Sequence, residues 1–317
     1  MNPRQTRIAV IGGGTGQSTM LRGLKAHSDN ITAIVTVTDD GGGSGVLRRE
    51  LHMPPPGDIR NCIQALANTE PAMQEMLGYR FHEGSLTGQS LGNLLLAALY
   101  DTSPSFDAAV RKLSQVLAIT GTVLPVTNSN IALEARFSDG AVIRGETTIT
   151  DYKRDTSAVI ERISLVPPSP PALPAVLDAI ANADMIVLGP GSLYTSVIPN
   201  LLTADVADAI CASAAVKVYV MNIMTQDGET ESYTAAHHVR ALRRHGGAGL
   251  FDYVLLNDRP IPDDIAAAYR RENAAPVAAW KNGLVRHDPP ALAKALMDLY
   301  YGCAATRTAE LNGQVTP

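Results

Sequence analysis

Three glycine-rich segments, each directly after an apolar run, constrain the fold of this 317-residue chain more than any other feature. GGGTG (12–16) follows RIAVI, TDDGGGSG (38–45) follows ITAIVTV, and GPGS (189–192) follows MIVL. Near-continuous apolar runs are typical of parallel strands buried on both faces. The pattern therefore predicts an α/β fold, a Rossmann-like, mostly parallel sheet with helices on both faces and its glycine loops at the carboxyl ends of the strands.

Two stretches interrupt the alternation of strands and helices. After the PPPG turn at 54–57, apolar residues recur at helical spacing, which predicts a helical segment. Residues 122–166 contain short β-like runs bounded by turn residues and predict a β excursion rich in hairpins. A proline-rich connection at 167–174 follows. We expect a single domain, 1–317, that carries both additions.

Charge and cysteine content limit the partners and the compartment. The net charge of -5 and pI near 5.8 give no general attraction to polyanions, so we expect no nucleic-acid partner. The apolar run at 94–100 is far shorter than the ~18 residues of a membrane span, and we recognise no signal peptide. Three scattered cysteines suit a reducing compartment. We expect a cytoplasmic protein without a membrane span.

The loop GGGTG, between a predicted strand and a predicted helix, is a candidate phosphate site. Backbone N–H groups at a helix start can bind phosphate, and glycines allow the ligand to approach closely. The loop departs from the dinucleotide fingerprint because Gln17 stands where the third glycine belongs, and it lacks the lysine of a P-loop. The alternative is a tight turn with no ligand.

The segment TDDGGGSG combines two acids with a loop too rich in glycine to order itself. Asp39 or Asp40 could bind Mg²⁺ or sugar hydroxyls, while the loop amides meet a phosphate. Strand alternation points the two acids in opposite directions, so we do not expect them to share one role. The alternative is a solvated acidic turn.

The segment GPGSLYTSVIPN (189–200) brings a third set of glycines and hydroxyls to the same edge of the sheet. GQSLGN (88–93), at a predicted helix start, adds a fourth contact through Asn93, although Gly92 could serve only close helix packing. The convergence predicts a phosphate- or sugar-bearing ligand. The residues expected to bind it in these four segments are Gly13, Gly14, Thr15, Gly16, Asp39, Asp40, Gly42, Gly43, Ser44, Asn93, Gly189, Gly191, Ser192, Thr195 and Asn200.

Searches for a nucleophile or a metal motif assign no catalytic residue. GxSxG is absent and no Ser-His-Asp triad follows from spacing. His237, His238 and His245 are better explained by a solvated helix face than by zinc. The turn at 226–229 is either a sheet-edge loop or part of the pocket wall. Arg286 and His287 are either a cationic pair for a diphosphate or part of a helix cap.

Taken in order, these motifs resemble the YvcK-type gluconeogenesis factor family within the CofD-like superfamily. The motifs are GGGTG, TDDGGGSG, PPGDIRNC, GQSLGNLLLAAL, TVLPVT, GPGSLYTSVIPNLL, NIMTQDGET and LVRHDP, spread over almost the whole chain. The resemblance implies a cytoplasmic regulator of cell shape and cell-wall precursors on gluconeogenic carbon sources, and binding of UDP-sugars such as UDP-N-acetylglucosamine. It places Thr15, Asn200 and Arg286 on the ligand. We also expect a homo-oligomer and a protein partner in cell-wall regulation.

The sister branch, CofD proper, implies the alternative function. Its members transfer phospholactate from a guanosine diphosphate carrier to the deazaflavin Fo, with Mg²⁺ held by aspartates. Those aspartates correspond to Asp39 or Asp40 and to Asp58, so we expect a metal only under this alternative. The chain departs from the usual patterns at Gln89, where histidine is common, and at Asp227, where proline is common. A scaffold that binds only proteins is a third interpretation and leaves the glycine loops unexplained.

Overall fold

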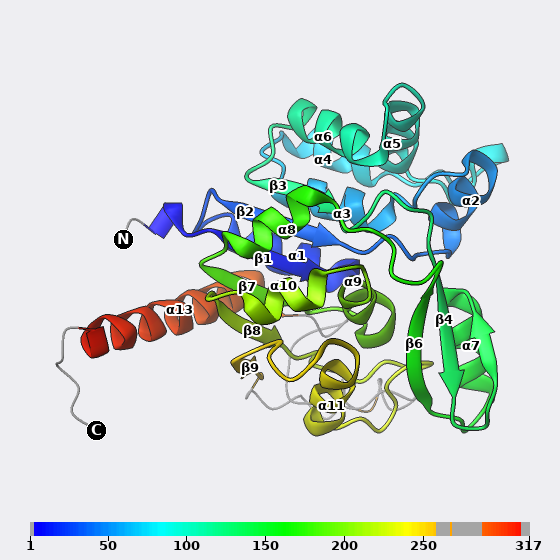
Figure 1. Ribbon diagram of the computed structural model, residues 1–317. Coiled ribbons are helices and arrows are strands. Elements are labelled where there is room, and N and C mark those ends of the chain that lie inside the picture. Colours follow the sequence, from blue (N-terminus) through cyan, green and yellow to red (C-terminus); the bar gives the residue numbers. More distant parts are fainter. Residues whose placement is uncertain (1–2, 258–266, 268–286, 312–317) are drawn as a thin grey trace.

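The structure, a computed structural model, describes residues 3–257, 267 and 287–311 (Figure 1). The main sheet contains β1 (Ile8–Gly12), β2 (Ile31–Val35), β3 (Thr122–Pro125), β7 (Met185–Leu188), β8 (Val216–Val220) and β9 (Tyr253–Leu255), and the excursion contains β4 (Ala132–Phe137), β5 (Val142–Arg144) and β6 (Ile160–Val166). The helices are α1 (Gly14–Leu24), α2 (Gly42–Leu51), α3 (Gly57–Leu66), α4 (Pro71–Gly78), α5 (Leu91–Asp101), α6 (Phe106–Val116), α7 (Glu146–Asp155), α8 (Pro174–Ala181), α9 (Ile198–Leu201), α10 (Val206–Ala212), α11 (Ala235–Gly246) and α13 (Pro289–Leu311), with short turns η1 (Pro3–Gln5), η2 (Gly84–Leu86) and η3 (Leu193–Val197).

The main sheet has the strand order β3-β2-β1-β7-β8-β9, and every neighbouring pair is parallel. In chain order this is the 3-2-1-4-5-6 arrangement of the doubly wound dinucleotide-binding fold. The chain winds in one direction from β1 to β3 and in the other from β7 to β9. The loops after β1 and β7 therefore diverge at a switch point, where ligands of such sheets bind. The predicted fold class is confirmed.

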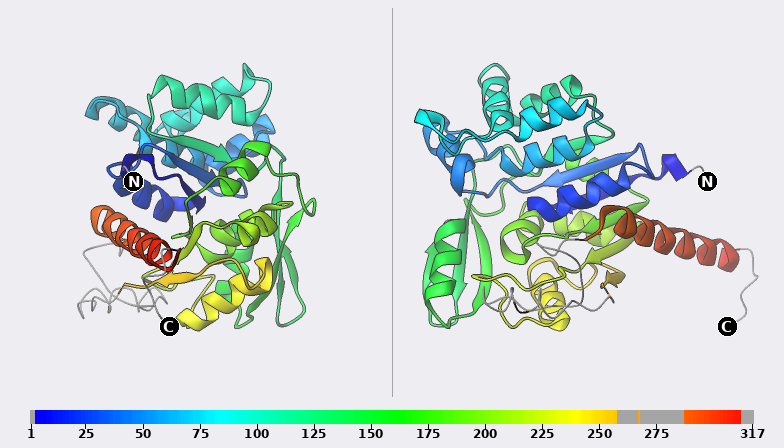
Figure 2. Two further views of the ribbon diagram at one scale, coloured as in Figure 1. Left: turned by 60° about the vertical axis from the view of Figure 1, so that its left-hand side comes forward. Right: turned by 180° about the vertical axis from the view of Figure 1, so that it is seen from behind.

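Helices cover both faces of this sheet. Helices α8, α9, α10 and α11 lie on the face turned toward the viewer in Figure 1, whereas α1, α3 and α13 lie in front in the right-hand view of Figure 2. The strands β1, β7 and β8 are consequently buried along their whole length, which is why their sequences are almost entirely apolar. Helices α4, α5 and α6 form the predicted helical segment beyond the β3 edge. Among the described residues, none of the helices combines the length and the apolar character needed to cross a membrane.

The β excursion is smaller than the sequence suggested. The strand β3, expected inside it, pairs in parallel with β2 and extends the main sheet. The remaining strands form an antiparallel sheet of order β5-β4-β6. The segment 146–155, interpreted from sequence as β-like, is the helix α7, because Gly145 turns the chain at φ 99° and distant groups cap the helix start. The excursion stands beside the carboxyl ends of the main strands (Figure 1).

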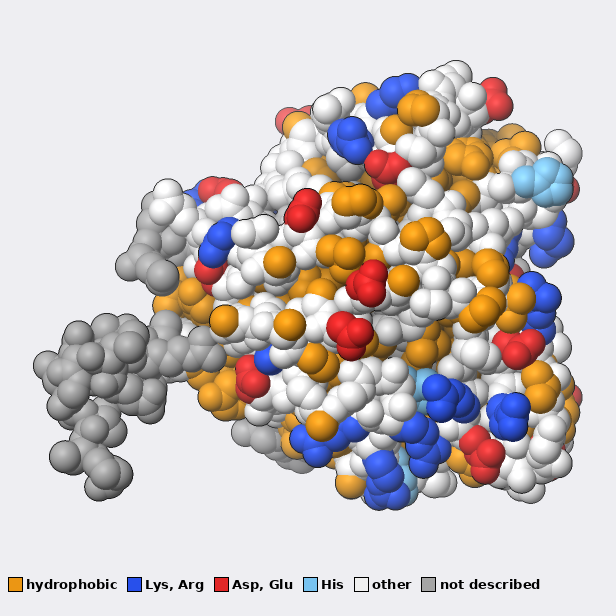
Figure 3. All heavy atoms as spheres, viewed as in Figure 1, with side chains coloured by type: hydrophobic (Ala, Val, Ile, Leu, Met, Phe, Trp, Pro, Cys, Tyr) orange, Lys and Arg blue, Asp and Glu red, His pale blue; other side chains and the backbone are white. Residues whose placement is uncertain are grey.

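Charge on the surface is local rather than general. Lysine and arginine side chains gather in the lower part of the face shown in Figure 3, near α11, whose last turn contains Arg243 and Arg244. Acidic side chains lie scattered over the middle of the same face. This distribution agrees with the absence of a general attraction to polyanions that the net charge implied.

Candidate functional site

The loops after β1 and β7 touch each other through their backbones at the switch point. A Cβ added to Gly16 would lie 2.7 Å from the carbonyl oxygen of Pro190, and one added to Gly191 would lie 3.0 Å from that of Gly13. Real Cβ atoms essentially never lie 2.7 Å from backbone, so glycine is required at position 16, and the 3.0 Å approach at position 191 would be tighter than most real contacts. The glycines therefore serve loop contact as well as any approach of a ligand.

Asn200 stabilises the contact between the loops after β1 and β7. Its side chain is fully buried, and Nδ2 donates to the carbonyl oxygens of Gly12 at 3.0 Å and Ser196 at 2.8 Å. Both amide protons are thus used to hold the loop after β1 against the turn η3. Its predicted contact with a ligand stays a prediction. Thr15, by contrast, is exposed in the first turn of α1, where a ligand can reach it.

The loop after β8 completes the site. Asn222 exchanges two hydrogen bonds with the backbone of Gly191, at 3.1 Å and 2.8 Å, and Ser192 Oγ donates to Gln226 Oε1 at 2.7 Å. The turn at 226–229 therefore contacts the loop after β7, and its place in a pocket wall stays a prediction. Sequence reasoning missed Asn222, although a polar residue directly after a buried strand is the signal that could have indicated it.

Glu229 is a second residue that the sequence did not reveal. Its side chain is 2% exposed, and Oε1 accepts the backbone N–H groups of Tyr194 at 2.8 Å and Thr195 at 3.0 Å. Burial raises the pKa of this carboxyl to about 7, although the same backbone N–H groups oppose the rise. Glu229 thus holds the start of η3 in place, and Thr195 in it is almost fully buried.

The Asp58 carboxyl is hydrogen-bonded to one of the backbone amides that were expected to bind phosphate. Its Oδ2 accepts the backbone N–H of Gly14 at 2.6 Å. Desolvation raises the pKa of Asp58 to about 6, with the Gly14 N–H opposing the rise and the charge of Asp39 adding to it. An anion bound at this helix start would meet the Asp58 carboxylate. The protein's own carboxyl therefore competes with a phosphate for the Gly14 amide.

Asp39 and Asp40 point to different partners, as expected, although β2 ends at Val35 and strand alternation does not reach them. Asp39 Oδ1 accepts the N–H of Gly41 at 2.9 Å, and burial raises the pKa of Asp39. Asp40 faces the excursion, where its two oxygens accept the N–H groups of Glu146 and Thr147, both at 2.9 Å, and the Thr147 hydroxyl at 2.7 Å. Asp40 is thus the cap of α7, and Asp39 remains with the switch-point loops.

Asp40→Ala is expected to lower the free energy of unfolding by about 1–2 kcal/mol, because the first amides of α7 lose their acceptor and a negative charge leaves a helix start. Urea unfolding of the whole chain measures the change. Exposed Asp178 on α8 provides the control, since Asp178→Ala should change the same quantity by less than about 0.5 kcal/mol. Equal effects of the two substitutions would contradict the capping role.

The remaining glycines of TDDGGGSG are not a loop. Gly42, Gly43 and Ser44 form the first turn of α2, which begins at Gly42 with φ 47°. A Cβ on Gly45 would collide with the carbonyl oxygen of Asp40, so this glycine is needed for packing. The predicted glycine loop is therefore the start of a helix, and its ordering by a ligand stays a prediction.

Five carboxyls influence one another where the excursion meets the switch point. Burial and the negative charges of Asp39, Asp58, Asp40 and Glu229 raise the pKa of Glu146 well above its usual range. Glu146 comes from the excursion, and no sequence pattern indicated it. Across the described part of the chain, no three Asp, Glu, His or Cys side chains are placed so that they could hold a metal together.

Helix α7 also binds the loop after β8 through ion pairs. Arg154 Nε lies 2.7 Å from Asp227 Oδ2, and Lys153 Nζ lies 3.0 Å from Glu231 Oε2. Asp227, noted as a departure from the family pattern, thus pairs with the excursion. Together with the Asp40 cap, these contacts make α7 a bridge between the loops after β2 and β8.

Several sequence-based interpretations of histidines are corrected. His238 is fully buried and bonds through Nδ1 to the Thr234 carbonyl at 3.1 Å, so it does not belong to the solvated helix face, on which His237 is exposed. His287 Nε2 lies 3.0 Å from the Met221 carbonyl oxygen, and burial lowers the pKa of His287. His287 is therefore neutral at pH 7 and supplies no positive charge for a diphosphate. Arg286 lies outside the described residues.

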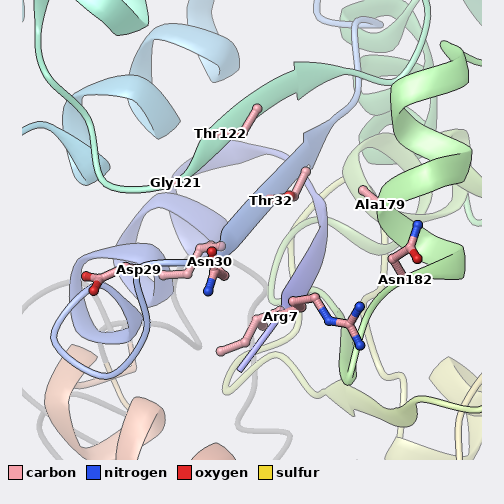
Figure 4. Close-up of a pocket in the computed structure, with 10 residues that line it drawn as sticks. Arg7, Asp29, Asn30, Thr32, Gly121, Thr122, Ala179 and Asn182 are labelled. Atoms are coloured by element: carbon pink, nitrogen blue, oxygen red, sulfur yellow. The ribbon is translucent and has the colours of Figure 1, made fainter. Parts of the chain in front are cut away.

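Two hollows in the described part of the chain lie away from the switch point. One, of about 240 Å³, opens at the amino ends of the strands and is lined by residues that include Arg7, Asp29, Asn30 and Asn182 (Figure 4). The other lies between α6 and β3. Open α/β sheets bind ligands at the carboxyl ends of their strands, so the loops at the switch point are the better candidate site.

Comparisons with known proteins agree with this geometry. The family model described as 2-phospho-L-lactate transferase CofD matches residues 8–297. A protein of Thermoanaerobacterium thermosulfurigenes is 52% identical over 312 residues, which cover 92% of this chain and 96% of its own length. The gluconeogenesis factor of Bacillus subtilis is 45% identical over 316 residues, 93% of this chain and 98% of that protein. A crystal structure of a protein from Bacillus halodurans matches with a TM-score of 0.89 at 41% identity, over 92% of this chain and 99% of that one.

Proposed function

Because this chain belongs to the CofD family, we propose that it is a gluconeogenesis factor that binds a nucleoside diphosphate sugar at the switch point. The observation that carries the proposal is the meeting of the loops after β1, β7 and β8 through Gly16, Gly191 and Asn222. UDP-N-acetylglucosamine is the ligand we favour. In this proposal the protein acts in the cytoplasm and adjusts cell shape and cell-wall precursors to gluconeogenic carbon sources.

The backbone at the start of α1 would receive the diphosphate. α1 is an 11-residue helix with no acidic residue in its first turn, so its positive end faces the loop. Thr15 is exposed there, and Gly14, with φ 67°, turns the chain toward it. The hydroxyl of Ser192 and the amide of Gln226, already bonded to each other, are suited to sugar hydroxyls. Asp58 must give up the Gly14 amide for a phosphate to take it.

Isothermal titration with UDP-N-acetylglucosamine is expected to show one site, with uridine as the control that lacks the diphosphate and the sugar. Since a ligand that binds only the folded state stabilises it by mass action, ligand at ~100 times its dissociation constant should add about 2.7 kcal/mol to the free energy of unfolding. Absence of heat and of any thermal shift with every UDP-sugar tried would reject the proposal.

A second function, a metal-dependent transferase, is favoured by the two acids that face the switch point. Burial raises the pKa of both Asp39 and Asp58, and the negative charge of Asp39 raises that of Asp58 further. A cation bound there would favour the charged form of both carboxyls. Mg²⁺ commonly takes only one or two carboxylates together with phosphate oxygens and water, so this donor set fits a metal that arrives with a diphosphate. Asp39 and Asp58 would hold it, and the metal would neutralise charge on the diphosphate.

The transferase is tested by product formation. Phospholactate linked to guanosine diphosphate serves as the donor and Fo as the acceptor, with Mg²⁺ present. Product that disappears with a chelator and in Asp58→Asn would support this function. Absence of product with both this donor and a uridine diphosphate donor would exclude it in favour of binding alone.

A further inference from the structure

Arg60, on α3, lies in a cradle formed by the start of α5. A Cβ added to Gly92 would lie 2.8 Å from the carbonyl oxygen of Leu77 and 2.9 Å from both Cγ and Cδ of Arg60, so glycine at position 92 lets α5 approach the backbone of α4 and the stem of the arginine together. The backbone N–H of Asn93 is held by Ser90 Oγ at 3.2 Å, which fixes the start of α5. The motif GQSLGN is thus built around the side chain of Arg60.

The guanidinium of Arg60 is held by neutral oxygens. Nε donates to Asn93 Oδ1 at 3.3 Å, and Nη1 donates to Gln64 Oε1 at 3.3 Å. Among the ion pairs within the described residues, none includes Arg60. Arginines with little exposure are normally paired with an acid. Amide oxygens orient the planar group without cancelling its charge.

A second arginine adds to the uncompensated charge. Burial and the nearby positive charge of Arg80 both lower the pKa of Arg60. Arg80 is exposed and donates through Nη1 to the carbonyl oxygen of Gly88, next to the buried side chain of Gln89. The described residues place Arg80, too, in no ion pair. The charge of Asp58 opposes the lowering of the Arg60 pKa, but neither arginine forms an ion pair within the described residues, so the two cations are suited to an anionic ligand.

We propose that Arg60, assisted by Arg80, binds a phosphate group of the nucleotide-linked ligand beside the glycine loop after β1. Asp58, two residues before Arg60 on α3, contacts the Gly14 amide, so the start of α3 lies beside that loop. The inference rests on the proposed function for the identity of the ligand. The chemistry it needs is only that of a phosphate oxyanion, which an arginine binds through two parallel N–H groups.

Isothermal titration with two probes, UDP-N-acetylglucosamine and inorganic diphosphate, tests the proposal. Arg60→Gln should weaken both by at least tenfold, and Arg60→Lys should recover part of the loss, because charge returns without the planar fork. The affinity of Arg60→Gln should also depend less steeply on salt concentration, because one cation is lost. Arg111 is an exposed residue of α6. Arg111→Gln is the matched control and should bind both probes as the wild-type protein does.

Thermal unfolding without ligand shows whether Arg60→Gln is folded. If it is not, Arg80→Gln, at an exposed position, takes its place in the titrations. Wild-type affinity for both probes in the variants would overturn the proposal. Tight UDP-sugar binding that ignores Arg60 rejects the subsite and leaves the proposed function standing. If diphosphate binding needs Arg60 but no UDP-sugar binds, the subsite stands and the proposed function is rejected. Wild-type protein that binds neither probe overturns both.

Discussion

Glu229→Ala is expected to lower the free energy of unfolding by about 3 kcal/mol or more at pH 7, because two buried backbone amides lose the oxygen that accepts them. The amides of Tyr194 and Thr195 both bond to Glu229 Oε1, and the side chain is 2% exposed, so no bulk water is available to replace it. The loss would fall on the turn η3, one of the loops that form the candidate site. UDP-N-acetylglucosamine binding should weaken along with stability.

Urea unfolding of the whole chain measures this effect. Glu161 is an exposed residue of β6. Glu161→Ala is the matched control and should change the free energy of unfolding by less than about 0.5 kcal/mol. Glu229→Gln keeps an oxygen for the two amides and should cost much less than alanine. A loss below about 1 kcal/mol for Glu229→Ala would show that η3 does not depend on this carboxyl.

The same carboxyl carries a pH dependence with a definite sign. Burial raises the pKa of Glu229 from 4.5 to about 7, so the folded state keeps its proton where the unfolded chain has released it. The stability that this proton contributes is complete below pH 4.5 and is lost as the pH rises toward 7. Glu229→Gln lacks this titration. Its free energy of unfolding relative to wild type should therefore rise by on the order of 3 kcal/mol between pH 4.5 and 8, and a constant difference would contradict the assignment.

The sheet could be predicted from sequence because its signals are local. The runs that became β1, β7 and β8 are apolar along their length, and each ends where a loop residue must turn the chain. Parallel pairing then brings the loops to one edge whatever the side chains do. The strand β3 was expected in the β excursion, because TVLP is short and directly precedes the other β-like runs, and only its pairing with β2 places it in the main sheet.

The excursion shows what local signals miss. The residues 146–150, ETTIT, favour a strand by composition, but the segment is helical because Asp40, more than a hundred positions earlier, accepts its first amides. The same long-range contact places Glu146 among the carboxyls of the site. A pair so distant in sequence leaves no periodic trace, so neither the helix nor its acid could be inferred.

The positions of the glycine motifs were predicted correctly, but the physical reason for glycine at these positions was predicted only in part. Glycine was expected so that a ligand could approach, yet Gly16, Gly45 and Gly92 each make room for another part of the chain. Gly92 in particular admits the stem of Arg60. A sequence shows that a side chain is absent at such a position, and only the fold shows what fills the space.

Asp58→Ala is expected to raise the affinity for UDP-N-acetylglucosamine by tenfold or more, about 1.4 kcal/mol, in buffer without divalent metal. The substitution frees the Gly14 amide from its 2.6 Å hydrogen bond and removes a negative charge from the place where the diphosphate would lie. Asp178→Ala, on exposed α8, is the control and should leave affinity unchanged. Isothermal titration at pH 8 gives the comparison.

The pH dependence of wild-type affinity checks the same competition independently. Because burial raises the pKa of Asp58 to about 6, the carboxyl is mostly charged at pH 8 and mostly neutral at pH 5. Wild-type protein should therefore bind the anionic ligand more tightly at pH 5, and Asp58→Ala should remove most of that difference. If Asp58 instead holds Mg²⁺ for a transferase, Asp58→Ala weakens binding in the presence of the metal and gains nothing without it. The sign of the change in each buffer therefore separates a carboxyl that competes with the diphosphate from one that helps to hold it.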